Sequence, residues 1–182
     1  MKVYTRSGDD GTTGLFYGGR VSKDAPGPSA YGTVDEAVSA LGVARAETAQ
    51  DSQISEILLR LQRELFVAGA ELATAPDNRH KLVDGVTRVT ADMVSRLEPL
   101  IDEVTARFSP PTEFVLPGEG RVGAAIDLAR TIVRRAERDT VAAVHAGWLA
   151  EDSQVLPHLN RLADLCWTLA RWQEGQWRAV RT

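Results

Sequence analysis

The segment "DSQISEILLRLQRELFVAGAEL", residues 51–72, decides the fold class of this chain. Its apolar side chains recur with the heptad-like spacing of a helix that buries one face: Ile54, Ile57, Leu58, Leu61, Leu65, Ala68 and Leu72. Asp51 or Ser52 can cap the start of this helix. A long amphipathic helix of this kind is typical of a helical bundle.

Similar periodicity predicts four further helices: one that follows Pro28, and three over about residues 90–108, 121–145 and 156–173. The start of the first is open, because Pro28 and Ser29 suit it but the capping box "TVDE" at residues 33–36 does too. Pro99 predicts a kink or a break in the helix that contains it. With little strand signal, the chain is expected to be all-α, a five-helix antiparallel bundle.

Bulk composition excludes several classes of protein. A formal net charge of −4 argues against a general nucleic-acid binder, which normally carries a basic excess. The single cysteine, Cys166, excludes an internal disulfide and multi-cysteine metal sites. The opening residues have no apolar secretory segment, and no run approaches membrane-spanning length. We therefore expect a cytoplasmic protein with one domain, residues 1–182, and no membrane partner.

The segment "ARTIVRRAERD", residues 129–139, is the most basic part of this acidic chain. On a helix, Arg130, Arg134 and Glu137 lie within an arc of roughly 60°, beside the apolar stripe. One interpretation is a solvated face with salt bridges. The other is an anion site, because arginines crowded on one turn repel one another unless an anion neutralises them, and arginine suits bidentate binding of phosphate.

The last helix carries a polar strip of Asn160, Asp164, Trp167 and Arg171 opposite its apolar side. Trp167 is unusual there, since exposed tryptophan is costly. It indicates either a subunit or loop contact, or a flat surface that faces a ligand. Cys166 lies on the apolar side, which favours a buried structural thiol.

The N-terminal stretch "TRSGDDGTTG", residues 5–14, has the glycines and hydroxyl groups of a phosphate-binding loop but matches neither G-x-x-x-x-G-K-[ST] nor G-x-G-x-x-G. Its glycines permit turns that expose backbone N–H groups, and Arg6, Arg20 and Lys23 add positive charge. The adjacent aspartates, Asp9 and Asp10, are then expected either to stabilise the fold of the loop or to bind a divalent cation that accompanies the phosphates. A solvated turn is the alternative.

Five segments, in this order and at this spacing, resemble the PduO-type ATP:cob(I)alamin adenosyltransferases over most of the chain: "YTRSGDDGTTGL", "AYGTVDEAVSALG", "FVLPGEG", "ARTIVRRAERD" and "LNRLADL". The resemblance implies a ferritin-like bundle, residues 29–173, between an ATP-binding loop, residues 1–28, and a C-terminal tail, residues 174–182. It also implies a homotrimer with active sites between subunits. The implied reaction transfers the 5′-deoxyadenosyl group of ATP to cob(I)alamin, with Mg²⁺, and releases triphosphate.

The resemblance also implies roles for individual residues. The residues expected to wrap the ATP phosphates are Thr5, Arg6, Ser7, Gly8, Thr13, Gly14 and Lys23. The rest of the nucleotide site is expected from Arg134, Arg135, Ala136, Glu137, Arg138 and Asn160. Asp35 and Arg130 match an inter-subunit salt bridge. Phe114 matches the aromatic beneath the corrin, and Trp167 matches a bulky aromatic of the same pocket. The ligands of Mg²⁺ are not assigned.

Three positions depart from the family pattern. Glu119 interrupts a glycine pair in "LPGEG", Gly27 stands where a basic residue is frequent, and a longer cobalamin-covering segment is shortened or absent after "QWRAVRT". Two other functions are open beside the enzyme: a carrier that delivers adenosylcobalamin to a dependent mutase, and a nucleotide-sensing bundle with no corrinoid role. A flavoprotein-type reductase is the expected source of electrons.

Overall fold

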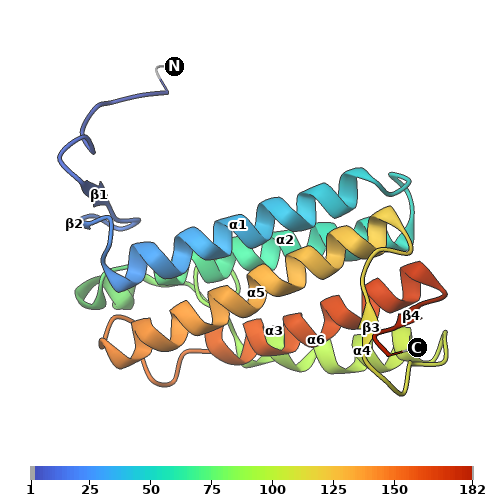
Figure 1. Cartoon of the computed structure of the whole chain (residues 1–182). Coiled ribbons are helices and arrows are strands. Elements are labelled where there is room, and N and C mark those ends of the chain that lie inside the picture. The colour runs from blue at the N-terminus through green and yellow to red at the C-terminus, as the bar shows by residue number, and fades with distance from the viewer. Residues whose placement is uncertain (1–2, 182) are drawn as a thin grey trace.

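The computed structural model describes residues 3–181, and helices dominate it (Figure 1). The helices are α1 Pro26–Ala46, α2 Gln53–Leu72, α3 Ala91–Ser95, α4 Leu97–Thr105, α5 Arg121–His145 and α6 Val155–Glu174, with a 3₁₀ turn η1 at Pro76–Lys81. Helix α5 packs against α1 and α6, α1 packs against α2, and α4 packs against α6. The predicted helical bundle is confirmed, with the expected third helix divided into α3 and α4. No helix within residues 3–181 is long and apolar enough to cross a membrane.

The apolar stripe that predicted α2 forms part of the core. All seven of its residues are buried, and Leu58, Leu61 and Leu65 are fully inaccessible to solvent. The Ser52 hydroxyl oxygen caps this helix by accepting a hydrogen bond from the backbone N–H of Ser55 at 3.3 Å. Local periodicity and capping therefore suffice to define α2.

Two predicted helix boundaries need correction. Helix α1 begins at Pro26, ahead of Pro28, Ser29 and the "TVDE" box, because proline has a preset φ and suits the first helical position. The bundle thus starts at residue 26 rather than 29, and α6 extends to Glu174 rather than 173. The break attributed to Pro99 is confirmed and lies at Arg96, since the Pro99 ring would crowd the Ser95 carbonyl of an unbroken helix.

Two small antiparallel sheets lie at opposite ends of the bundle (Figure 1). Strands β1, Thr12–Gly14, and β2, Arg20–Ser22, lie near the start of α1. Strands β3, Val115–Leu116, and β4, Arg178–Ala179, lie near the start of α5. Helix α5 has 25 residues, which corresponds to about 37 Å between its ends. The N-terminal loop and the Phe114 segment are therefore far apart within one chain.

Hydrogen bonds fix the N-terminal segment to the C-terminal end of α2. The backbone N–H of Phe16 donates to the Ala73 carbonyl at 3.0 Å. The Asn78 side-chain amide of η1 donates to the carbonyl oxygens of Tyr17 and Gly18, both at 3.3 Å. These contacts anchor the base of the N-terminal loop and leave its tip, residues 3–11, outside the helices (Figure 1).

Packing explains why a glycine stands at position 27, at the same end of the bundle. A Cβ at this position would overlap the indole ring of Trp148. That ring is held in place because its Nε1–H donates to the Leu72 carbonyl at 2.8 Å. Trp148 therefore occupies the space that a side chain at position 27 would need, which explains the glycine in the first turn of α1.

We predict that Gly27→Ala lowers the free energy of unfolding by about 1–3 kcal/mol, because the added methyl group overpacks against a fixed ring. In a Trp148→Ala background the same substitution should instead be neutral or stabilising by up to about 1 kcal/mol, since alanine suits a helix better than glycine. Chemical denaturation of the four proteins of this cycle tests the coupling. Gly69→Ala is the control, because its nearest neighbour would be Val34 Cγ1 at 3.9 Å. Equal effects of Gly27→Ala in both backgrounds would disprove the account.

Candidate functional site

A cavity of about 1020 Å³ opens beside the Phe114 segment, between α5, α6 and the C-terminal strand. Its lining residues are Pro111, Thr112, Glu113, Phe114, Val115, Pro117, Asp127, Arg130, Trp167, Arg171, Val180 and Arg181. The cavity brings together Phe114 and Trp167, which the family resemblance assigned to one pocket, and it also contains Arg130, which was expected in a salt bridge between subunits. Phe114 is 89% exposed, so its ring contributes little to the core and is available to a ligand.

One wall of this cavity carries a chain of buried charges. Asp127 accepts from Arg171 through Oδ2 and from the Nε–H of Arg130 through Oδ1, the latter at 3.2 Å. Arg171 also lies 2.8 Å from a carboxylate oxygen of Glu174. The Asp127 side chain is 4% exposed and that of Arg171 1%, so these charges depend on one another for compensation. The guanidinium of Arg130 is thereby directed along the cavity wall.

The loop that carries Phe114 is held by the C-terminal strand. In the β3–β4 register Val115 pairs with Ala179 and Leu116 with Arg178. The Val180 N–H donates to the Phe114 carbonyl at 2.9 Å. The Glu119 carboxylate, which interrupts the glycine pair, lies 2.8 Å from Arg178 and does not line the cavity. The C-terminal strand and Val180 therefore brace this loop directly.

The arginine-rich segment of α5 continues from the cavity toward the other end of the helix. Arg134, one turn beyond Arg130, is exposed, and within residues 3–181 its guanidinium has no carboxylate partner. Arg138 is also exposed and donates to the Arg134 carbonyl at 2.9 Å. An exposed guanidinium without an internal partner is free to bind an anion.

Glu137 and Asn160 connect α5 to α6 beside these arginines. The Asn160 side-chain amide donates to Glu137 at 2.8 Å, and its carbonyl oxygen accepts from Arg161 at the same distance. The two residues are thus brought together, as their assignment to one nucleotide site required. They supply fixed acceptor and donor groups on the α5–α6 surface.

Two residues predicted in the nucleotide site have other contacts in this chain. Arg135 donates to Glu36 of α1, so its guanidinium is already neutralised. The Ala136 side chain is fully buried in the core, so any contact of this residue with a ligand would have to involve its backbone. The helical pattern of residues 129–139 could not predict the contact between Arg135 and Glu36, because Glu36 lies in a distant part of the sequence.

Asp35 and Arg130 do not form a salt bridge with each other in the single chain. Asp35 is exposed on α1 and has no cationic partner within residues 3–181. Arg130 is paired with Asp127. The predicted bridge between these two residues therefore remains a prediction for two copies of the chain.

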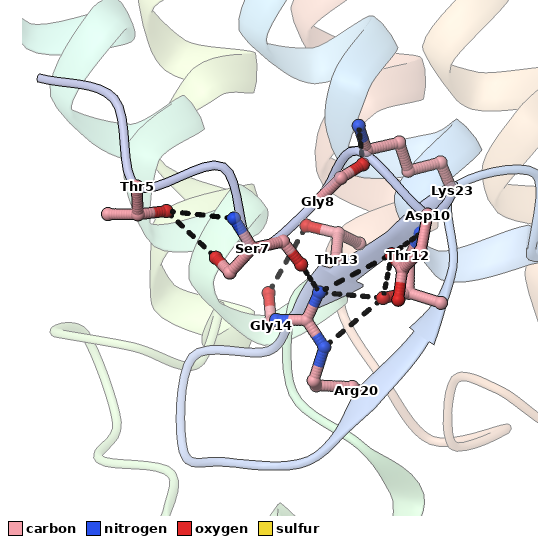
Figure 2. Close-up of polar contacts among 9 residues, drawn as sticks. All are labelled: Thr5, Ser7, Gly8, Asp10, Thr12, Thr13, Gly14, Arg20 and Lys23. Carbon is pink, nitrogen blue, oxygen red and sulfur yellow. Dashed lines mark hydrogen bonds and ion pairs between the residues drawn. The ribbon is translucent and has the colours of Figure 1, made fainter.

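The N-terminal loop is ordered by its own polar contacts (Figure 2). The hydroxyl groups of Thr5 and Ser7 are 2.8 Å apart, and Lys23 Nζ donates to the Gly8 carbonyl at 2.8 Å. Arg20 binds the Ser7 carbonyl and the Thr12 hydroxyl. These contacts hold basic and hydroxyl groups together around the turn.

Two residues of the turn have a positive φ, which is strained for Arg6 and ordinary for Gly11. Arg6 has a φ of 63°, in the left-handed region that non-glycine residues seldom occupy, and Gly11 has a φ of 81°. Strain of this kind gathers at ligand-binding loops. Thr13 and Gly14 form β1 with β2 and lie beside the turn.

Asp10 serves the fold of this loop. Its carboxylate accepts from the Thr12 backbone N–H at 2.9 Å and from the Thr12 hydroxyl at 2.7 Å. These two hydrogen bonds hold the pKa of Asp10 below its ordinary value, with Arg20 adding a smaller contribution. Of the two functions expected for the aspartates, the structure shows the structural one for Asp10. Among residues 3–181 no three His, Cys, Asp or Glu side chains are grouped to hold a metal ion.

Cys166 is a structural thiol, as predicted. It is fully buried, and burial raises its pKa to about 12. A thiol with such a pKa is not a nucleophile at neutral pH.

Comparison with known proteins agrees with this geometry. The family model described as cobalamin adenosyltransferase matches residues 3–173. A corrinoid adenosyltransferase from Citrobacter freundii is 40% identical over 95% of both chains. One from Mycobacterium tuberculosis is 42% identical over 93% of this chain and 87% of the relative.

Solved structures show the same architecture. A variant of the PduO-type ATP:corrinoid adenosyltransferase from Lactobacillus reuteri, complexed with cobalamin and ATP, superposes with a TM-score of 0.88 at 31% identity, over 100% of both chains. A second variant, in which an arginine is replaced by lysine, is complexed with ATP and gives a TM-score of 0.83 at 30% identity, over 98% of this chain and 100% of the other. The chain belongs to the PduO-type corrinoid adenosyltransferases, and its activity is that of an enzyme of this family.

Proposed function

We propose that this enzyme transfers the 5′-deoxyadenosyl group of ATP to cob(I)alamin in a site shared by two protomers of a homotrimer. The observation that carries this proposal is the position of Arg134, an exposed guanidinium without a carboxylate partner within residues 3–181, one helical turn from the Arg130 cavity. That position supports an anion-binding role for Arg134, next to a large cavity that aromatic side chains line. The relatives that bind both ATP and cobalamin support the same pairing of ligands.

The cavity suits a corrin. Its volume of about 1020 Å³ is at the upper end of ordinary ligand pockets, as a macrocycle requires. Phe114 and Trp167 supply flat apolar surfaces. Apolar side chains at the lower face would exclude an axial ligand from cobalt and so favour the reduced metal of the substrate. The protein then needs to supply geometry rather than its own nucleophile.

The transfer forms one bond and breaks one. Cobalt(I) of the substrate donates an electron pair to the 5′ carbon of ATP, and the carbon–oxygen bond breaks with its electron pair passing to triphosphate. Arg134 is placed to stabilise the negative charge as it develops on the departing group. Glu137 and Asn160 would orient the nucleoside, so that the reacting atoms are aligned.

The distance between the two ends of the bundle supports a phosphate-binding loop that comes from a neighbouring copy. Within one chain, the loop and the Phe114 cavity lie at opposite ends of a bundle whose α5 helix is about 37 Å long (Figure 1). In a cyclic trimer the loop of one protomer can reach the α5 surface of the next. We propose that Thr5, Arg6, Ser7, Gly8, Thr13, Gly14 and Lys23 bind the phosphates in this way.

Mg²⁺ would be held mainly by the phosphates themselves. Asp10 is already engaged by Thr12, and the residues of the loop offer hydroxyl and backbone groups rather than a cage of carboxylates. This donor set fits a cation that keeps several waters and enters with ATP. Bound there, Mg²⁺ would neutralise part of the charge of the polyphosphate.

Other sequence-based expectations stay predictions. They are a flavoprotein-type reductase as electron donor, delivery of the product to an adenosylcobalamin-dependent mutase, and a cytoplasmic location. The Arg134 and Phe114 positions favour catalysis over a carrier function alone, because a carrier needs no group for departing triphosphate.

We predict that the wild-type protein consumes cob(I)alamin in the presence of ATP and releases triphosphate, and that Arg134→Ala lowers kcat by about 100- to 1000-fold. Its Tm should stay within a few degrees of wild type, because Arg134 is exposed and has no ion pair among residues 3–181. The measurement is the loss of cobalt(I) absorbance together with triphosphate release. The control is Arg63→Ala, an exposed arginine on α2, which should keep full activity. Wild-type turnover by Arg134→Ala would place the site elsewhere.

We predict that Asp35→Asn weakens the association of protomers by about 1 kcal/mol per contact and raises the ATP concentration needed for half-maximal rate about fivefold. The reason is that Asp35 would lose Arg130 of the adjacent copy. Analytical ultracentrifugation and ATP titration measure the two effects, with the exposed Asp51→Asn as control. An unchanged association constant and ATP dependence would rule out the bridge.

A further inference from the structure

We infer that Glu174 is a positioning residue of the corrin cavity: it fixes the loop that carries Phe114, and buried Arg171 holds its carboxylate in place. The inference rests on the proposed function, because it assigns the Phe114 cavity to the corrinoid. Neither the sequence pattern nor the comparisons assign Glu174 to the site.

The contacts of Glu174 are directed at the loop backbone. Its Oε1 accepts the backbone N–H of Gly118 at 3.0 Å and that of Glu119 at 3.2 Å. Both groups lie a few residues after Phe114, in the connection from β3 to α5. Two consecutive N–H groups bound to one ionised oxygen form a strong, charge-assisted anchor.

The opposite side of the carboxylate meets Arg171. The Glu174 side chain is fully buried, and its Oε2 lies 2.8 Å from an Arg171 terminal nitrogen. Arg171 in turn binds Asp127, which holds Arg130. The same buried chain therefore joins the Phe114 loop to the guanidinium that lines the cavity.

Gly123 provides the space for this arrangement. A Cβ at position 123, in the first turn of α5, would overlap Cγ of Glu174 and lie 3.0 Å from its Cδ. The glycine thus lets the α6 carboxylate approach the start of α5 and reach the two N–H groups. The missing side chain at Gly123 and the carboxylate of Glu174 are therefore both needed for the hydrogen bonds to the loop backbone.

Stability alone does not account for these groups. Buried ion pairs are often no more stabilising than apolar residues of the same volume. Here the Arg171 Nε–H and the Glu174 Oε2 both lack a hydrogen-bond partner within the described chain, so the 2.8 Å contact between Arg171 and Glu174 is an ion pair without hydrogen-bond geometry. We therefore infer that the buried charges of the cavity wall serve to fix the geometry of the loop. Phe114 is exposed directly before β3, and the anchored connection directly follows β3, so these contacts restrain the position of Phe114 through this strand.

The test compares Glu174→Ala, Glu174→Gln and Gly123→Ala with wild type, using the full chain. Glu174→Ala should raise the KM for cob(I)alamin about tenfold and leave the KM for ATP within about twofold, because the loop contacts the corrinoid. Gly123→Ala should act in the same direction by displacing the carboxylate. Glu174→Gln keeps an acceptor oxygen for the two N–H groups, so its effect should be smaller. Glu151→Gln, an exposed carboxylate before α6, should match wild type.

Hydrogen exchange of the ligand-free proteins gives a second readout. The peptide spanning residues 114–121 should exchange faster in Glu174→Ala than in wild type, with Glu174→Gln between them and the α2 peptides unchanged. If Glu174→Ala does not fold, the Gly123→Ala and Glu174→Gln proteins decide the question by the same two measurements. Wild-type exchange and a wild-type corrinoid KM in the folded variants would overturn the inference. A wild-type protein that consumes no cob(I)alamin would instead refute the proposed function, while faster loop exchange would still show that Glu174 anchors the loop.

Discussion

The length of α5 is the constraint on which the account depends. This rigid helix separates the N-terminal loop, with its basic and hydroxyl groups, from the aromatic cavity beside Phe114 (Figure 1). Within residues 3–181, the basic and hydroxyl groups of the loop and the aromatic residues of the cavity thus lie at different ends of the bundle. A packed bundle cannot shorten this distance. In the proposed mechanism these parts meet between neighbouring copies of the chain, so catalysis would require the association of protomers.

The α5–α6 surface connects these two parts chemically. Arg130 is fixed by buried Asp127 at the cavity, whereas Arg134, one turn later, is unpaired within the described residues. Arg130 therefore forms part of the cavity wall, whereas Arg134 is available to bind a ligand. Glu137 and Asn160 continue the same surface with a hydrogen bond across the two helices.

Local patterns in the sequence predicted much of this arrangement. The α2 stripe and the ends of α5 follow from periodicity, and Phe114 and Trp167, which the family resemblance assigned to one pocket, both line the cavity. Contacts between distant segments could not be predicted in this way. Arg135 was grouped with the ligand-binding arginines, but it pairs with Glu36 of another helix. The contact of Glu174 with the Phe114 loop needs the tertiary fold, since only the crossing of α5 and α6 at Gly123 brings the groups together. The early start of α1 reflects proline at its first position, whereas the apolar stripe begins only at Ala30.

A subunit-mixing experiment tests the shared site most directly. Lys23→Ala damages the loop and leaves α5 intact, whereas Arg134→Ala does the reverse. If each site takes its loop and its α5 surface from different protomers, trimers reassembled from equal amounts of these two inactive proteins contain wild-type sites at about a quarter of their interfaces. The account predicts that about this fraction of wild-type turnover returns on mixing. Mixed trimers that stay as inactive as either parent would contradict it.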